Sequence, residues 1–124
     1  MPFKIKWEKQ GSVTTYSGTV NIDEVFEADR YFNNDPRSDD AEYQIIDFSQ
    51  AKPGIVDESR ILHIAAMDYG VSHSIPQLNV AFITEDQYIK RLCNDYINMC
   101  KEMGIKWNFR IFSEMKSARR WALS

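Results

Sequence analysis

The sequence predicts a mixed α/β domain built on a five-stranded, largely parallel sheet, and two observations lead to this fold class. First, residues 3–8 alternate bulky apolar with charged side chains, and the β-branched segment 13–19 follows after a Lys-Gln-Gly-Ser turn, which is typical of a β-hairpin. Second, helix-type and strand-type segments alternate from there to the end of the chain, as they do in parallel sheets with right-handed crossovers. The expected element order is β-β-α-β-α-β-α-β-α.

The first helix and the strand after it are bounded by short sequence signals. Asn21 is a predicted N-cap, because Glu24 three residues later completes a capping box. The helix is expected to end before Pro36, since proline disfavours helical backbone in the residue that precedes it. Residues Tyr43–Phe48 then form the third strand, which a turn at Lys52-Pro53-Gly54 is predicted to follow.

The second helix is predicted from its apolar spacing. It is expected to begin near Asp57 and to run to about Tyr69, with Gly70 as its C-terminal stop, because glycine commonly follows the last helical turn. The residues expected to face inward are Ile61, Leu62, Ala65 and Tyr69.

The last four elements follow from one apolar run and further cap signals. Leu78–Ile83 is almost uninterrupted apolar sequence, which is typical of a central strand covered on both faces. The next helix is predicted to start at Thr84, through a second capping box, and to end at Gly104. Ile105–Phe112 is the predicted fifth strand, and a final helix is expected to close the chain at Trp121–Leu123.

The composition indicates one domain of ordinary size over residues 1–124, and it disfavours several partners. The chain has 15 Lys and Arg residues against 18 Asp and Glu residues, a formal net charge of −3, so no affinity for nucleic acid is expected. No apolar run approaches the roughly 18 residues that cross a bilayer, and the first residues contain no apolar signal-peptide centre. We therefore expect a cytoplasmic protein without a membrane span.

Motifs that would mark catalysis, a cofactor or a metal are missing from the sequence. The glycines form neither a G-x-G-x-x-G nor a G-x-x-x-x-G-K-[ST] phosphate loop, and there is no nucleophile elbow. His63 and His73 lack partners at the spacing that general-base or metal chemistry requires. Cys93 and Cys100 are expected to be small core residues on one helix face. The sequence thus favours a protein that is not an enzyme and that has no cofactor or metal site.

Five polar residues around the end of the predicted third strand are the candidate residues for binding a ligand or partner. Ligands of open α/β sheets bind beyond the carboxyl ends of the strands. Asp47 interrupts an apolar strand, and we expect it to lie at such an end together with Ser49. The candidates are Asp47, Ser49, Asp57, Glu58 and Ser59. The alternative is that Asp47 and Ser49 bind loop amides, and that Asp57 only caps the second helix.

Short segments spread over almost the whole chain carry a resemblance to a known family. They are Tyr16-Ser17-Gly18, Asp35-Pro36-Arg37, Tyr43–Ser49, Asn79-Val80-Ala81, Arg110-Ile111-Phe112 and Ala118-Arg119-Arg120-Trp121. In their order and spacing they resemble the STAS domain (sulphate transporter and anti-sigma factor antagonist), and more closely the SpoIIAA-like group of small bacterial proteins.

This resemblance implies a cytoplasmic, non-catalytic domain whose mixed sheet is backed by helices. Members act as regulatory binding partners, which are switched by phosphorylation of a serine in an Asp-Ser-Ser/Thr-Gly motif at the start of the helix after the third strand. The matching residues here are Asp57-Glu58-Ser59-Arg60, so glutamate occupies the acceptor position and the glycine is missing. The resemblance therefore predicts a regulatory protein-interaction module without a working phospho-switch, in which Glu58 is a fixed negative charge and Ser59 a weak acceptor.

The same group is often described alongside lipid-carrying domains, which implies an alternative function. The alternative is a small-molecule or lipid-binding protein with an apolar pocket under the second helix, covered by the loop of residues 70–77. A homodimer is a further hypothesis, because the alternating edge strand of residues 3–8 could pair with a second copy. Lys4 and Lys6 are charges of the kind that discourage such pairing.

Overall fold

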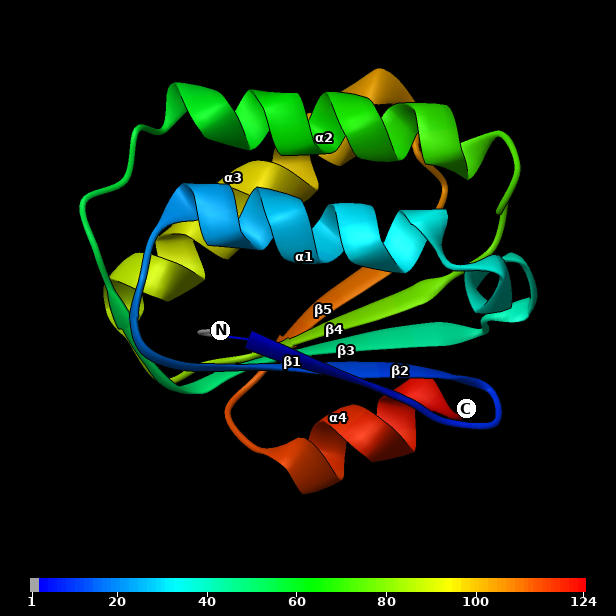
Figure 1. Cartoon of the computed structure of the whole chain (residues 1–124), viewed down its shortest axis with the longest axis horizontal. Helices are drawn as coiled ribbons and strands as arrows, with labels where there is room; N and C mark the ends of the chain where they lie inside the picture. Colours follow the sequence, from blue (N-terminus) through cyan, green and yellow to red (C-terminus); the bar gives the residue numbers. More distant parts are fainter. Residues whose placement is uncertain (1–2) are drawn as a thin grey trace.

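The computed structural model describes residues 3–124 and consists of a five-stranded sheet with helices on both faces (Figure 1). The strands are β1 (Phe3–Trp7), β2 (Gly11–Val20), β3 (Tyr43–Pro53), β4 (Asn79–Ile83) and β5 (Asn108–Phe112). The helices are α1 (Ile22–Asn34), the 3₁₀ helix η1 (Pro36–Asp40), α2 (Ser59–Ser72), α3 (Gln87–Met103) and α4 (Met115–Ala122). The predicted fold class and order of strands and α-helices are confirmed. The segment between α1 and β3, for which the sequence predicts no helix, contains the short η1 helix.

The strands lie side by side in the order β1-β2-β3-β4-β5. Strand β1 pairs with β2 antiparallel, and the other three pairings are parallel. Helices α1, α2 and α3 cover one face of the sheet, and α4 alone covers the other face, against β3 and β4 (Figure 1). Each parallel strand is followed by a helix, so the sheet positions the start of every helix at the carboxyl edge of the strands.

Alternation of side chains along the strands divides the core into two clusters. On the face of α4, Ile45 and Ala81 are completely buried against Ala118. On the other face, Phe32 of α1 is completely buried and stacks on Trp7 of β1, with ring centroids 5.3 Å apart. Among residues 3–124, no helix has both the length and the apolar character needed to cross a bilayer.

Strand β3 is longer than the sequence predicts. The register of β2 against β3 shifts between Thr15 and Ser17, and the second half of β2 then continues to pair as far as Val20 with Pro53. The extra residue of this bulge lies in β3. The predicted end of the strand at Phe48 is therefore wrong, because β2 still offers backbone hydrogen bonds beyond that residue.

The inward face of α2 also differs from the prediction. Leu62 and Tyr69 are 48% and 42% exposed, and Gly70 lies within the helix rather than ending it. The buried stripe has the spacing i, i+3, i+4, i+7 and consists of Ile61, Ile64, Ala65 and Asp68. The prediction is thus confirmed for Ile61 and Ala65 and wrong for Leu62 and Tyr69, whose expected places in the core are taken by Ile64 and Asp68.

Side-chain caps fix the starts of α1 and α3 at the carboxyl edge of the sheet, whereas α2 starts without one. The predicted cap of α1 is confirmed, since Asn21 Oδ1 accepts a hydrogen bond from the Glu24 amide at 3.1 Å. The cap of α3 is Asp86 and not Thr84, because Asp86 Oδ1 accepts from the Ile89 amide at 2.9 Å. Gly104, at φ +93°, ends α3 as predicted.

A charged cluster attaches α4 to the start of the chain. Arg119 donates two hydrogen bonds to the Glu8 carboxylate, at 2.9 Å to Oε1 and 2.7 Å to Oε2. The Tyr43 hydroxyl donates to the same Oε1. These contacts, the Arg119 hydrogen bonds first, lower the pKa of Glu8 from 4.5 to about 2. The carboxylate therefore stays ionised and paired over the ordinary pH range.

Candidate functional site

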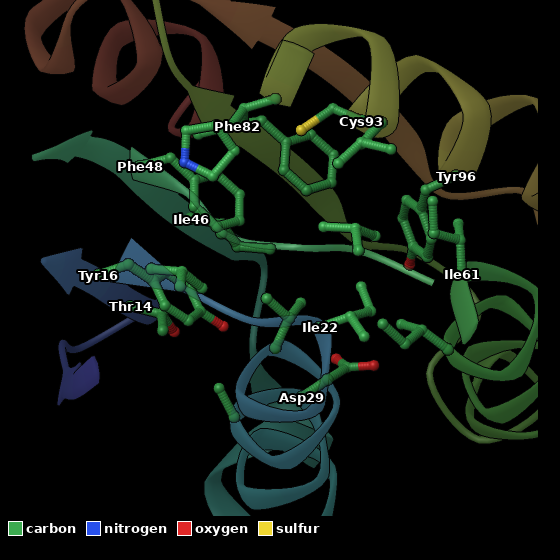
Figure 2. A pocket seen from close by; sticks show the side chains of 18 of the residues that line it. Thr14, Tyr16, Ile22, Asp29, Ile46, Phe48, Ile61, Phe82, Cys93 and Tyr96 are labelled. Atoms are coloured by element: carbon green, nitrogen blue, oxygen red, sulfur yellow. The ribbon is translucent and has the colours of Figure 1, made fainter. Parts of the chain in front are cut away.

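A cavity of about 110 Å³ lies between the sheet and the three helices on its helical face. Its floor is formed by β2, β3 and β4, and its walls by α1, α2 and α3 (Figure 2). The lining side chains are mostly apolar, and among the largest of them are Ile22, Ile46, Phe48, Ile61, Phe82 and Ile89. The strands supply the alternate residues that point toward the helices, and each helix supplies its inward stripe.

Four aromatic rings form much of the wall of this cavity. Tyr16 stacks on Phe48 with ring centroids 4.8 Å apart, and Phe82 meets Tyr96 edge to face at 5.9 Å. Tyr16 is only 2% exposed, although it carries a hydroxyl group. Burial, followed by the nearby acidic groups, raises the pKa of Tyr16 above its ordinary value, so the ring presents a neutral phenol to the cavity.

The outer part of the cavity lies at the carboxyl edge of the sheet. Asn21, at the start of α1, is exposed, and Pro53 and Val56 before α2 are partly exposed. Ile55, which lies between Pro53 and Val56 in the chain, is 97% exposed. A ligand entering here would reach the cavity where ligands of parallel α/β sheets usually bind.

The inner part of the cavity contains two acidic residues, Asp29 of α1 and Asp68 of α2. Both of them, and Tyr96 of α3, lie in the third turn of their helices. Because the three helices all begin at the same edge of the sheet, these residues reach a similar depth, roughly 10–15 Å from that edge at 1.5 Å per residue. Figure 2 shows the Asp29 carboxyl group and the Tyr96 hydroxyl entering the space between the sheet and the helices.

The two carboxyl groups are unequally satisfied by hydrogen bonds. Asp68 is 2% exposed, and it accepts one hydrogen bond from Asn33 Nδ2 at 3.3 Å and another from the Tyr96 hydroxyl. Asp29 Oδ2 has no accessible surface and no hydrogen-bond partner within the described part of the chain. An unpaired buried acceptor costs about 1–3 kcal/mol, so this oxygen is an unusual feature of the fold.

Burial gives both acidic groups raised pKa values. The pKa of Asp29 is well above its ordinary value, because desolvation and then the charge of Asp68 disfavour its ionised form; the Gln44 side chain acts in the opposite direction. Desolvation also raises the pKa of Asp68, against the hydrogen bonds that it accepts. Two carboxyl groups this close titrate as a pair, and both pKa values lie above that of an ordinary aspartate.

Two cysteines lie near this pair as buried free thiols, as the sequence predicts for core residues. Burial raises the pKa of Cys93, which lines the cavity, and of Cys100 to about 12. Since only a thiolate is a strong nucleophile, neither cysteine is activated for chemistry. No group of three His, Cys, Asp or Glu side chains within residues 3–124 is arranged to hold a metal ion.

The five residues predicted from the sequence lie outside the cavity lining. Asp47 and Ser49 are internal to β3, not at its end, and Asp47 Oδ1 accepts from the Ser49 amide at 2.9 Å. Asp57 Oδ1 accepts from the Ser59 amide at 3.1 Å and from its hydroxyl at 2.6 Å. Glu58 forms an ion pair with Arg91 of α3 at 3.0 Å. The structure thus brings Asp57, Glu58 and Ser59 together at the start of α2, and their binding role stays a prediction.

The acidic pair that the sequence interpretation missed has a recognisable signal. Asp29 lies seven residues after Ile22 and four after Val25, and Asp68 has the same spacing from Ile61 and from an isoleucine at position 64. Both are therefore charged residues inside the apolar stripe of a helix. A charged side chain at such a position must be paired or neutralised, which makes it a candidate for function.

Comparison with known proteins identifies the fold. No protein-family model matches the chain, and no curated protein matches it either. Among solved structures, an uncharacterised protein of the DUF3478 family from Shewanella loihica PV-4, which has a SpoIIAA-like fold, is similar with a TM-score of 0.55. The match covers 97% of this chain and 91% of that one, at 14% sequence identity. The chain has a SpoIIAA-like fold. The resemblance that the short sequence segments indicate is thus supported at the level of the fold.

Proposed function

We propose that the protein binds a small, mostly apolar molecule in the cavity between the sheet and helices α1–α3. The observation that carries this proposal is an unfilled space of about 110 Å³ with walls of aliphatic and aromatic side chains. Protein interiors are otherwise closely packed, and an engineered apolar cavity of about 150 Å³ is large enough to bind benzene. The cavity here is smaller than that, so the buried part of the ligand is no larger than one benzene ring.

The chemistry of the lining supports binding rather than a reaction. The Cys93 thiol and the Tyr96 hydroxyl both have raised pKa values and remain protonated, so neither is a ready nucleophile or base. Asp29 and Asp68 lie at the inner end of the cavity, away from its outer part at Asn21. Nothing in the lining supplies a nucleophile beside a general base, and a non-enzymatic role follows from this arrangement.

Toluene is a suitable probe, because it matches the cavity in size and has no polar group. We expect toluene to shift the methyl ¹³C and ¹H NMR signals of Ile22, Ile61 and Ile89, which line the cavity, in a saturable manner. Ala28→Leu should abolish these shifts, since Ala28 lines the cavity and a larger side chain would occupy it. The matched control is Ala66→Leu, at an exposed position of α2. Unchanged methyl signals in the unsubstituted protein would refute the proposal.

A second candidate is a regulatory protein-interaction module without a working phospho-switch. The observation that favours it is Ile55, a large apolar side chain that is 97% exposed beside Asp57 and Glu58. The Ser59 hydroxyl is held by Asp57, and the fixed charge of Glu58 lies at the start of α2, where helix dipoles favour anions. A partner protein would cover Ile55 and contact the acidic residues around it.

Affinity capture with matched variants tests this second candidate. We expect a partner retained by the unsubstituted protein to be lost with Ile55→Ser and kept with Leu123→Ser, because Leu123 is also exposed but follows α4 on the opposite face of the sheet. A partner that is retained equally by both variants does not use this surface, and such a result would exclude the proposed interaction.

A further inference from the structure

The acidic inner end of the cavity lacks a cation. The structure holds four ion pairs among residues 3–124, and none of them includes Asp29 or Asp68. The pKa values of Tyr16, Tyr96 and Cys100 are raised by burial and in part by the charge of this pair, so these three groups are neutral at pH 7. Buried carboxylates in proteins are normally paired with a cation or a metal, so this pair is incomplete by itself.

The buried oxygens at this end lack hydrogen-bond donors. Asp29 Oδ2 and Asn33 Oδ1 both have no accessible surface and no partner among the described residues. Asn33 Oδ1 can only accept, and Asp29 Oδ2 accepts when its carboxyl group is ionised. Both belong to side chains grouped around Asp68: Asn33 donates to it, and Asp29 lies beside it. A ligand that completes this arrangement must therefore bring donors, and a protonated amine brings up to three of them with a positive charge.

The aromatic walls favour the same kind of ligand. Tyr16, Phe48, Phe82 and Tyr96 all line the cavity, and they come from three strands and one helix beside the sheet. The faces of aromatic rings attract cations, by about 2 kcal/mol or more where water is excluded. This observation is independent of the acidic pair, and it also points to a cationic group.

We propose that the cavity binds a small apolar amine in its protonated form. The ammonium group lies at Asp29 and Asp68, and the apolar body lies against the aromatic and aliphatic walls nearer the outer part of the cavity. This inference rests on the proposed function and adds to it the chemical class of the ligand. It also predicts which molecules the cavity rejects: a carboxylate of the same size would place a second negative charge beside the acidic pair, without a cation to balance it.

Four probes of nearly equal size distinguish the inference from the proposed function. They are toluene, benzyl alcohol, benzylamine and benzoate, each titrated at pH 7 and followed through the methyl signals of Ile22, Ile61 and Ile89. We expect benzylamine to bind at least tenfold more tightly than benzyl alcohol, and benzoate to bind more weakly than toluene. If toluene binds but benzylamine binds no better than benzyl alcohol, the inference is wrong and the proposed function stands. If none of the four binds, both are wrong.

A variant assigns the preference to the acidic pair. Asp29→Asn keeps the shape of the side chain and removes its capacity to share a negative charge, so benzylamine should lose at least tenfold in affinity while toluene changes less than twofold. The matched control is Asp40→Asn, an exposed residue of η1, which should leave both affinities unchanged. An Asp29→Asn protein that folds and still prefers benzylamine would overturn the assignment. Should that variant not fold, the order of affinities among the four probes in the unsubstituted protein decides the inference.

Discussion

Glu8 and Asp68 are two carboxyl groups with little solvent exposure on opposite faces of the sheet, and only Glu8 is paired with a cation. Each accepts a hydrogen bond from a tyrosine hydroxyl, Tyr43 for Glu8 and Tyr96 for Asp68. Glu8, with a side chain 17% exposed, also receives two hydrogen bonds from Arg119. Asp68 is 2% exposed and has no cation, only the Asn33 amide and the neighbouring carboxyl of Asp29.

The difference separates a structural contact from a candidate binding site. Where the chain supplies its own counter-charge, the pKa falls to about 2 and the carboxylate holds α4 against the first hairpin. Where it supplies none, the pKa values of Asp29 and Asp68 rise, and one oxygen stays without a partner. Glu8 receives its counter-charge from Arg119 of the same chain. At Asp29 and Asp68, a ligand would have to supply the counter-charge and the missing hydrogen bond.

Removal of the cation on the α4 face should have the largest effect. Arg119→Met keeps much of the apolar stem and leaves Glu8 without its partner, so we expect a loss of about 1–2 kcal/mol in the free energy of unfolding at pH 7. The magnitude takes account of solvent screening, because the Arg119 side chain is 39% exposed. Urea unfolding of this variant against Lys116→Met, an exposed position on the same helix, provides the measurement. Equal stabilities would mean that the ion pair does not hold α4.

The acidic pair should respond in the opposite direction. The folded protein keeps a proton on Asp29 that the unfolded chain releases, so the contribution of Asp29 to stability is highest below the ordinary aspartate pKa of about 4 and falls as the pH rises toward the raised pKa. Asp29→Asn should remove this slope and increase the free energy of unfolding at pH 7 by about 1–2 kcal/mol. Urea unfolding between pH 4 and 8 tests this, and a variant that is less stable than the parent at pH 7 would contradict it.

The two tyrosine hydroxyls offer a paired test of the same contrast. Tyr96→Phe removes one of the hydrogen bonds that Asp68 accepts, and with no cation in reach we expect a loss of about 1–2 kcal/mol. Tyr43→Phe leaves Glu8 with Arg119, so a loss below about 1 kcal/mol is expected. Thermal unfolding of both variants is sufficient. A greater loss from Tyr43→Phe would reverse the ranking of the two sites.

Acid should weaken the α4 attachment by the smallest amount. The pKa of Glu8 is lowered from 4.5 to about 2, so its contribution is present above pH 4.5 and is lost as the pH falls through about 2. Glu8→Gln should flatten the stability profile over this interval, by less than about 1 kcal/mol for a partly exposed pair. Urea midpoints at pH 2, 3 and 5 check the expectation, with Glu102→Gln, at an exposed position of α3, as the control.

The sequence predicts the fold well and the cavity poorly, for reasons that lie in particular residues. Asn21 and Gly104 determine helix ends through local contacts, and local contacts can be inferred from neighbouring residues. Asp68 is buried by contacts with α1 and α3 that are distant in the chain. Strand β3 runs on past Phe48 because β2 pairs with it there. Unfilled space between six elements is likewise a property of the packing, and no local pattern encodes it.

The protonation state of Asp29 is the most direct test of the central claim, that a buried acidic pair without a cation ends the apolar cavity. The carboxyl ¹³C signals of aspartates report protonation residue by residue, and a titration from pH 2 to 9 would follow Asp29 and Asp68 together. We predict that Asp29 remains a carboxylic acid at pH 7 in the free protein and that Tyr96→Phe alters the titration of Asp68. If Asp29 instead titrates near pH 4 like an exposed aspartate, water reaches the pair or a cation of the chain already compensates its charge. Either result would mean that the account of the site is wrong.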